Sequence, residues 1–182
     1  MPPKSKKASE SYVTMTEMVL PNDTNPLNNL MGGRLMHLMD IAAAISAQKH
    51  CNRVVVTASV DNVSFEASVP LGGVVTLESH VSRAFNSSME VYVEAYGENI
   101  LEGSGRKLAY KAFLTFVAVD QMGNPINVPE LEPETEKEIM LFDGALRRRQ
   151  LRLVLAGRMK PEDATELKSL FFKINPEGVE EK

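Results

Sequence analysis

Three residues whose types could do chemistry share one stripe of a predicted helix. Gly33, His37 and Asp40 stand at positions i, i+4 and i+7. At about 100° per residue they line one side of a helix, with the glycine at its amino end. Desolvation disfavours a charged aspartate among apolar residues unless the carboxylate is paired or hydrogen-bonded. Asp40 is therefore a candidate functional carboxylate, and a hydrogen-bonded structural carboxylate is the alternative.

The helix that must position these residues is unusually apolar. From Leu35 to Ala47 only His37, Asp40 and Ser46 interrupt a run of leucine, methionine, isoleucine and alanine. A helix that is apolar on all sides is typical of the interior of a protein. The sequence therefore predicts one buried helix as the centre of the fold.

The entry to this helix combines a proline, two asparagines and two glycines. Pro26 disfavours helical geometry at the residue before it, Asn25, so the helix is not expected to start before the proline. Asn28 or Asn29 is expected to cap the helix with its side chain. Gly32 and Gly33 have no Cβ, so the backbone can approach whatever occupies the mouth of the helix.

Composition limits the classes of protein that the chain can represent. It has 182 residues, 43% of them hydrophobic and 24% charged, and a formal net charge of −4. The hydrophobic and charged fractions are those of an ordinary globular chain with one core. The negative net charge gives no general attraction to nucleic acid. The first residues lack the apolar core of a signal peptide, and no run approaches the ~20 apolar residues of a membrane span. We therefore expect a cytoplasmic protein without a membrane partner.

Other catalytic or metal-binding patterns are weak. Cys51 is the single cysteine, so no intramolecular disulfide can form, and it fits a reducing compartment. His50 precedes it directly and cannot face it from the adjacent helical position, which disfavours a Cys/His nucleophile. Three histidines without zinc-motif spacing predict no metal site. No phosphate-binding or dinucleotide-binding glycine motif occurs.

Extended segments surround the central helix. Each is rich in β-branched residues or alternates apolar and polar positions, and turn residues separate them. The predicted strands are residues Tyr12–Leu20, Arg53–Phe65, Val74–Ala84, Met89–Tyr96 and Leu108–Val119. One strand, one helix and four consecutive strands predict an α+β fold with an antiparallel sheet around one helix.

The two ends of the chain differ from this central part. Residues 1–10 are rich in lysine and serine and are expected to be disordered, so the main domain is predicted over residues 11–122. Residues 123–182 are expected to form a proline-containing linker and a helical extension. In that extension Glu134–Leu155 has acidic residues first and arginines last, an order that suits a helix dipole. A second short helix is predicted from Pro161, and it carries Leu167, Leu170 and Phe171.

The arginines of the extension have two interpretations. A solvated face or a subunit contact is one of them, and binding of a ligand's phosphates is the other. The cluster consists of Arg147, Arg148, Arg149 and Arg152.

The segment Asn29–Asp40, NLMGGRLMHLMD, resembles the helix entry of the hot-dog acyl-CoA thioesterases, the YciA-like and cytosolic acyl-CoA hydrolase group. Val55–Phe65 and the strand end Thr115–Asp120 are similar to this family as well. The resemblance covers roughly residues 12 to 120. Met31 is a departure, because relatives often carry His or Phe there, so no polar role transfers to that position.

The resemblance implies a fold, an assembly and a set of catalytic residues. In that family the sheet wraps around the helix, two protomers pair into a continuous sheet, and the sites lie at the dimer interface. A homodimer assembled into a hexamer, as a trimer of dimers, is therefore expected. Asp40 corresponds to the catalytic carboxylate, Asn29 to an amide side chain from the facing protomer, and the Gly33 N–H to the oxyanion donor.

Further residues correspond to positions where relatives contact the substrate or its coenzyme A arm. His37 has two interpretations, an acid/base partner of Asp40 or a packed core residue. Arg83 is a candidate for binding phosphate. The full set is Gly32, His37, Thr57, Arg83, Asn86, Ser87 and Ser88.

The expected activity is hydrolysis of fatty acyl-CoA to a free fatty acid and coenzyme A. A thiolate is a good leaving group, so a positioned water, a base and an oxyanion hole suffice, and no cofactor is expected. Two alternatives remain, a non-catalytic acyl-CoA-binding sensor and a hot-dog dehydratase or hydratase acting on acyl thioesters. The dehydratase pattern carries a histidine in a proline-rich loop before the helix, and that loop is absent from this sequence.

Overall fold

The computed structural model describes residues 4–170, apart from the side chain of Asn62. The chain divides into two units, the first ending at Glu134 and the second beginning at Thr135. The first unit contains β1 (Ser5–Lys7), a 3₁₀ turn (Ala8–Ser11), β2 (Val13–Met18), a 3₁₀ turn (Pro21–Asp23), α1 (Gly32–Cys51), β3 (Val54–Phe65), β4 (Val74–Ala84), β5 (Ser88–Glu98), β6 (Lys107–Val119) and β7 (Glu130–Glu132). The second contains α2 (Glu136–Leu155), a 3₁₀ turn (Pro161–Asp163) and α3 (Thr165–Lys168).

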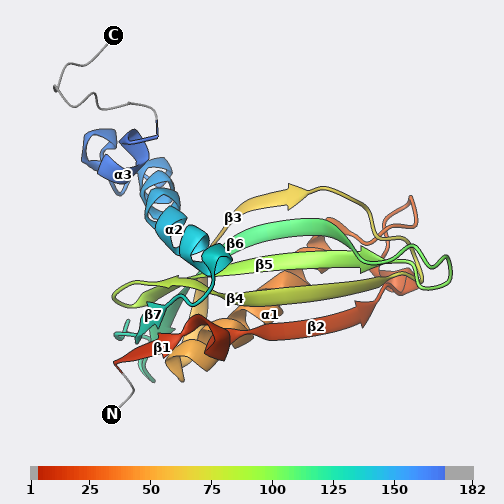
Figure 1. Ribbon diagram of the computed structural model, residues 1–182, viewed down its shortest axis with the longest axis horizontal. Helices are drawn as coiled ribbons and strands as arrows, with labels where there is room; N and C mark the ends of the chain where they lie inside the picture. Colours follow the sequence, from red (N-terminus) through yellow and green to blue (C-terminus); the bar gives the residue numbers. More distant parts are fainter. Residues whose placement is uncertain (1–3, 171–182) are drawn as a thin grey trace, which may run out of the picture. The chain divides into compact units, whose positions relative to one another are not determined.

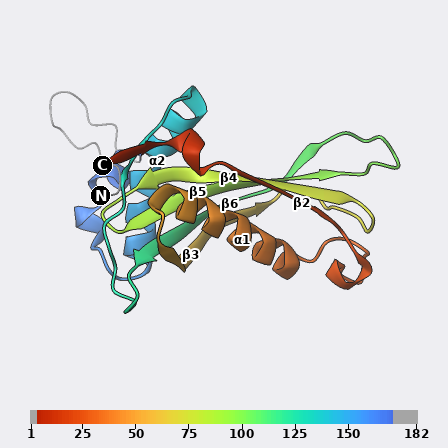
Figure 2. The same cartoon turned by 90° about the horizontal axis from the view of Figure 1, so that it is seen from below.

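The main sheet of the first unit has five strands in the order β2-β4-β5-β6-β3. Every neighbouring pair in it is antiparallel. Helix α1 lies along one face of this sheet (Figures 1 and 2). The prediction of an antiparallel α+β fold around one long helix is therefore confirmed.

The hydrophobic core lies between α1 and the inner face of the sheet. Leu35 and Met39 of α1 are buried, as are Leu77 of β4 and Phe116 of β6. A buried pair of hydroxyls joins the two layers, because Ser79 donates to the Ala42 carbonyl at 3.0 Å and lies 2.7 Å from the Ser46 hydroxyl. Buried polar groups cost stability unless they are bonded, so these contacts fix how α1 sits on β4.

The start of α1 differs from the prediction. Its N-cap is Met31, with no side-chain hydrogen bond, so capping by Asn28 or Asn29 is wrong. The reason is the turn before it, in which Asn28 adopts a left-handed conformation with φ 57°. The Asn25 carboxamide accepts hydrogen bonds from the Leu27 and Asn29 N–H groups instead.

Burial of α1 on all sides is also wrong for the single chain. Leu38 and Ala42 face the sheet and are buried, whereas Met36 and Ile45 are exposed by 44% and 40%. A helix packed on one sheet face covers only one of its own sides. The remaining apolar stripe of α1 lies open in the first unit.

Strand β3 forms one edge of the sheet. It pairs with β6, and no other strand among the described residues pairs with it. Its exposed apolar side chains include Val54 (63%), Val56 (48%), Val60 (42%) and Phe65 (58%). An open edge with exposed apolar residues is a ready template for pairing with another strand.

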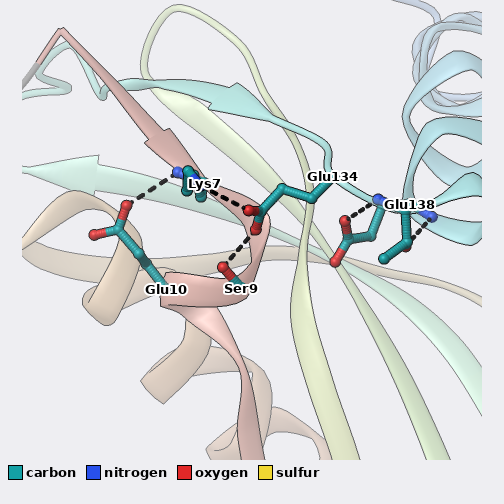
Figure 3. Close-up of polar contacts among 6 residues, drawn as sticks. Lys7, Ser9, Glu10, Glu134 and Glu138 are labelled. Atoms are coloured by element: carbon teal, nitrogen blue, oxygen red, sulfur yellow. Dashed lines mark hydrogen bonds and ion pairs between the residues drawn. The ribbon is translucent and has the colours of Figure 1, made fainter.

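The prediction of disorder over residues 1–10 is wrong for the residues that the structure describes. β1 pairs in parallel with β7, a strand more than a hundred residues later. Lys7 forms an ion pair with Glu134 at 3.0 Å, and the Ser9 hydroxyl donates to the same carboxylate (Figure 3). Hydrogen bonds from Ser9 and Lys7 lower the pKa of Glu134. These long-range partners supply the order that the local composition does not predict; residues 1–3 lie outside the described part.

The boundary of the main domain also differs from the prediction. Residues 123–134 belong to the first unit, where Ile126 and Val128 donate backbone hydrogen bonds to Ala118 and Asn86. His50 at the end of α1 approaches the Pro129 carbonyl through its Nε2 atom at 2.9 Å. The predicted linker is therefore part of the fold, and the extension begins at Thr135.

The second unit consists of the predicted helices. α2 begins with a capping box between Thr135 and Glu138, the latter also labelled in Figure 3. Its observed bounds agree with the predicted helix to within two residues. The predicted second helix is shorter than expected and contains Leu167, while Phe171 lies outside the described residues. None of the helices described is long and apolar enough to span a membrane.

Candidate active site

The Asp40 carboxylate is bonded to the edge strand. Its Oδ1 atom accepts a hydrogen bond of 2.8 Å from the Thr57 hydroxyl. Asp40 is half-buried and Thr57 is exposed, so solvent and small molecules can reach the pair. The bond orients one carboxylate oxygen and leaves the second oxygen available to hold a water.

The pair lies on an open strip that we call the α1–β3 seam. It consists of Gly33, Met36, His37 and Asp40 of α1 with Thr57, Val60 and Phe65 of β3. β3 runs antiparallel to α1 here, because Thr57 bonds Asp40 while a Cβ built on Gly32 would lie 3.4 Å from the Phe65 ring (Figure 2). One end of the seam is therefore the helix start, and Asp40 lies two turns further along.

The helix start provides unpaired N–H groups. The first intrahelical bond of α1 runs from the Leu35 N–H to the Met31 carbonyl, so the Gly33 N–H has no partner inside the helix. Gly33 is exposed, and a Cβ built on it meets no atom within 4 Å. The fold itself therefore leaves room at Gly33, where the N–H groups and the helix dipole favour an oxyanion.

Gly33 and Asp40 cannot act on the same carbonyl within one chain. Seven residues of helix separate them, which corresponds to about 10 Å of rise along the axis. A base and an oxyanion donor acting on one thioester carbonyl both lie within hydrogen-bond reach of its reacting atoms. Along α1, Gly33 and Asp40 of one chain are therefore too far apart to meet at a single carbonyl.

The turn before α1 contains two asparagines, Asn25 and Asn29, whose side-chain NH₂ groups differ in whether they are hydrogen-bonded. The Oδ1 atom of Asn25 accepts bonds from Leu27 and Asn29 at 2.9 and 3.2 Å, so its NH₂ group points away from the turn. Within the described part of the chain that NH₂ group has no hydrogen-bond partner. The NH₂ group of Asn29, in contrast, donates to the Leu27 carbonyl at 3.3 Å. Asn25 therefore has a donor available for a ligand, and the sequence analysis did not single it out.

His37 lies on the exposed side of α1, one turn before Asp40. Packing of its ring in the core of the single chain is therefore excluded. Among residues 4–170 its ring has no hydrogen-bond partner, and it does not bond Asp40. A role in acid/base chemistry would need a partner from outside the chain.

The remaining predicted contacts with the coenzyme A arm lie around the β4–β5 hairpin. Three strand steps separate its β4 arm from Thr57 and two steps separate its β5 arm, since Ala84 pairs with Met89, Met89 with Phe116, and Phe116 with Thr57. At the usual strand spacing these steps amount to about 14 Å and about 10 Å. The structure does not bring these residues to Asp40 of the same chain: Arg83, Asn86, Ser87 and Ser88.

Cys51 and His50 do not form a nucleophilic pair. Cys51 is buried, and burial raises the pKa of its thiol, which disfavours a reactive thiolate. The His50 ring points to the Pro129 carbonyl. In residues 4–170 no three histidine, cysteine or acidic side chains gather in a way that could hold a metal ion.

Comparison with known proteins gives the family. Residues 27–104 match the model of the thioesterase superfamily. The chain is 47% identical over 146 residues to YkhA of Bacillus subtilis, named an uncharacterized acyl-CoA thioester hydrolase, and the match covers 80% of this chain and 84% of that protein. The chain belongs to the thioesterase superfamily. The suspected resemblance to hot-dog thioesterases is thus confirmed.

Solved thioesterase structures have the same fold as this superfamily member. An apo-hexameric acyl-CoA thioesterase superposes with a TM-score of 0.81 at 41% identity, covering 84% of this chain and 97% of that one. An acyl-CoA hydrolase from Staphylococcus aureus, solved with butyryl coenzyme A, coenzyme A and coenzyme A disulfide, gives a TM-score of 0.78 at 36% identity and covers 91% and 99% of the two chains.

The Staphylococcus aureus enzyme was also solved with alanine in place of an asparagine, an aspartate and a threonine. In that protein these three positions follow one another at intervals of 15 and 17 residues. In this superfamily member Asn25, Asp40 and Thr57 are separated by the same two intervals.

Proposed function

We propose that this chain hydrolyses fatty acyl-CoA thioesters to a free fatty acid and coenzyme A. The observation that carries the proposal is the Asp40 carboxylate held by the Thr57 hydroxyl at 2.8 Å on an open seam, in a member of the thioesterase superfamily. Relatives and structural neighbours are named acyl-CoA thioester hydrolases and acyl-CoA thioesterases.

The chemistry follows from what each group can do. Asp40 either removes a proton from a water that attacks the thioester carbonyl or attacks the carbonyl itself to give an anhydride. Thr57 orients Asp40 by donating to one of its oxygens. The N–H of Gly33 and a side-chain amide stabilise the negative charge that develops on the carbonyl oxygen. The thiolate of coenzyme A then leaves and takes up a proton. On the anhydride route a water afterwards hydrolyses the anhydride, which releases the fatty acid and restores the Asp40 carboxylate. Neither route uses a cofactor or a metal.

We assign the side-chain amide to Asn25, with Asn29 as the alternative predicted from the sequence. An amide that stabilises an oxyanion must donate, and the NH₂ group of Asn25 is available while that of Asn29 bonds Leu27. The spacing of Asn25, Asp40 and Thr57 supports the same assignment, because it repeats the spacing of the altered positions in the Staphylococcus aureus enzyme.

The proposed site is shared between two protomers of a homodimer. The 10 Å of helix between Gly33 and Asp40 supports this, since two antiparallel helices can bring Gly33 of one copy beside Asp40 of the other. The open edge of β3 and the exposed apolar stripe of α1 supply surfaces that a second copy would cover. The hexameric relative supports assembly of such dimers into a trimer of dimers.

The coenzyme A arm extends away from the reacting carbonyl. Gly32 and His37 lie beside the reacting groups, and the β4–β5 hairpin with Arg83, Asn86, Ser87 and Ser88 stays the predicted region for the arm. Acyl-CoA is the proposed small-molecule partner. We propose that the protein acts in the cytoplasm and has no nucleic acid or membrane partner. Cell fractionation would test the location.

The experiment that tests the proposed activity measures thiol release. Purified protein is mixed with acyl-CoAs of graded chain length, and free coenzyme A is followed with a thiol dye. Hydrolysis with a clear optimum of chain length is the expected result. A chain that binds acyl-CoA without releasing thiol would be the sensor, and one that instead adds or removes water on an enoyl or hydroxyacyl thioester would be the hydratase or dehydratase.

Replacing Thr57 by valine should lower kcat about 10-fold with little change in KM. Valine keeps the shape of the side chain and removes the hydroxyl that orients Asp40. Serine at the same position keeps the hydroxyl and should restore most of the rate. Steady-state kinetics on one acyl-CoA would check this, and equal rates for the valine and wild-type proteins would remove Thr57 from the site.

A further inference from the structure

We propose that Asp23 and Arg34 form a clip that holds the Asn25 turn (residues 25–29) against the start of α1 and so positions the Asn25 amide for the reaction. Asp23 is the last residue of the 3₁₀ turn Pro21–Asp23, and Arg34 lies in the first turn of α1. The inference rests on the function proposed above, and it adds two positioning residues to the site.

The Asp23 carboxylate joins the turn to the helix through its two oxygens. Its Oδ1 atom lies 2.9 Å from the Nε atom of Arg34 in an ion pair, and its Oδ2 atom accepts a hydrogen bond of 3.1 Å from the Leu20 N–H. The side chains of Asp23 and Arg34 are exposed by only 16% and 33%. An ion pair sheltered in this way is screened less by salt than a pair on an open surface. The attraction therefore helps to hold residues 20–23 against α1.

Asp23 also fixes the two arms of the chain on either side of the Asn25 turn. Its carbonyl accepts a hydrogen bond of 2.8 Å from the N–H of Met31, the N-cap of α1. The Asn25 N–H donates to the Asn29 carbonyl at 2.8 Å. Asn25 follows Asp23 by two residues on one arm, and Gly33 follows Met31 by two residues on the other. A shift of Asp23 therefore moves the Asn25 amide relative to the Gly33 N–H, the other proposed oxyanion donor.

Charge rather than hydrogen-bond alignment holds the Asp23–Arg34 pair. The Arg34 Nε–H is buried, and within residues 4–170 no acceptor is aligned with it for a hydrogen bond. A lysine ammonium supplies the same charge without the planar geometry of a guanidinium. Lysine at position 34 is therefore expected to keep the clip, whereas methionine, which is uncharged, is expected to release it.

The Asn25 turn keeps other supports when the clip is released. The Leu30 N–H donates to the Val69 carbonyl and the Leu71 N–H donates to the Asn28 carbonyl, both at 2.8 Å. The turn should therefore loosen rather than unfold. A misplacement of about 1 Å at a reacting group costs up to about 10²-fold in rate, so partial loosening predicts a loss of about 10-fold in kcat.

Steady-state kinetics on one acyl-CoA tests the clip with a matched control. Arg106 is the control, because it pairs with Glu78 at 2.6 Å, and Glu78 points away from α1 while its neighbour Ser79 points towards it. Arg34→Met should lower kcat about 10-fold with KM within about twofold of wild type. Arg34→Lys and Arg106→Met should stay within about twofold in both constants. Wild-type kinetics in Arg34→Met, or a rise in KM with an unchanged kcat, would overturn the inference.

Asp23→Asn releases the same pair from the other side and guards against a misfolded Arg34 variant. Asparagine keeps an oxygen that accepts from the Leu20 N–H and removes the charge. It should match Arg34→Met in kcat and KM, and a wild-type kcat in this variant would reject the inference. Circular dichroism checks that each chain folds.

A double variant separates positioning from general damage to the fold. If the clip acts through the Asn25 amide, Arg34→Met has little further effect once that amide is absent. Asn25→Asp combined with Arg34→Met should therefore lose about 10²-fold in kcat/KM, the same as Asn25→Asp alone. A loss near 10³-fold, the product of the two single effects, would mean that Arg34 acts independently of Asn25 and would reject the inference.

Hydrogen exchange measures the clip without substrate, so it is separate from the activity test. The backbone N–H groups of residues 27–31 are all hydrogen-bonded. In Arg34→Met they should exchange about 10-fold faster, and in Arg34→Lys and Arg106→Met they should keep the wild-type rate. This pattern in a chain that hydrolyses no acyl-CoA would support the clip as a restraint on the turn and reject the proposed function. Unchanged exchange in Arg34→Met would reject the clip, whatever the activity of the chain.

Discussion

Replacing Asp40 by asparagine should lower kcat for acyl-CoA hydrolysis by about 10²-fold or more, with KM changed by less than about threefold. Asparagine keeps the shape of the side chain and can still accept the Thr57 hydrogen bond. It cannot remove a proton or form an anhydride. Steady-state kinetics with the preferred acyl-CoA and a folding check by circular dichroism would measure this.

Asp120 offers a matched control for the same change of chemistry. It is a partly buried carboxylate after β6, outside the α1–β3 seam, and its Oδ1 atom accepts hydrogen bonds from the Met122 and Asn124 N–H groups at 2.8 and 2.9 Å. Asp120→Asn keeps an accepting oxygen and should keep most of the wild-type kcat. Wild-type turnover by Asp40→Asn would contradict the catalytic assignment and favour the structural interpretation of Asp40.

Replacing Asn25 by aspartate should lower kcat/KM by about 10²-fold, the usual loss when one oxyanion donor is removed. Aspartate keeps an oxygen that accepts from Leu27 and Asn29, so the turn before α1 stays intact. It replaces the NH₂ donor by a second oxygen, which repels the developing charge.

Asn29 serves as the comparison for this prediction. Asn29→Ala removes a bond of 3.3 Å to the Leu27 carbonyl and should change kcat/KM by less than about threefold. The reverse pattern, with Asn29→Ala nearly inactive and Asn25→Asp active, would return the amide role to Asn29. Progress curves on a single acyl-CoA at low substrate concentration give kcat/KM directly.

Regular patterns in the sequence predicted the central fold well. The strand Val74–Ala84 has the predicted bounds, because its apolar and polar residues alternate and turn residues flank it. Gly33, His37 and Asp40 share one exposed side of α1 as their spacing predicts. These features depend on local periodicity, and local periodicity is visible in a sequence.

Features that depend on distant partners could not be predicted. β1 is short and polar, and it is ordered by pairing with Glu130–Glu132. Asn25 acquires its available NH₂ group from the geometry of a turn. The apolar stripe with Met36 looked like core in the sequence but is exposed in the single chain, because the composition of a helix does not show which of its sides the sheet covers.

Mixed dimers test the central claim, a site shared by two protomers, most directly. Asn25→Asp and Asp40→Asn chains, each nearly inactive alone, are mixed by co-refolding, so that random pairing makes about half of the dimers mixed. A mixed dimer has one site with both changes and one intact site, so activity should recover to roughly a quarter of wild type. If each site lay within one chain, every site would carry a change, and a mixture no more active than its parents would contradict the shared site.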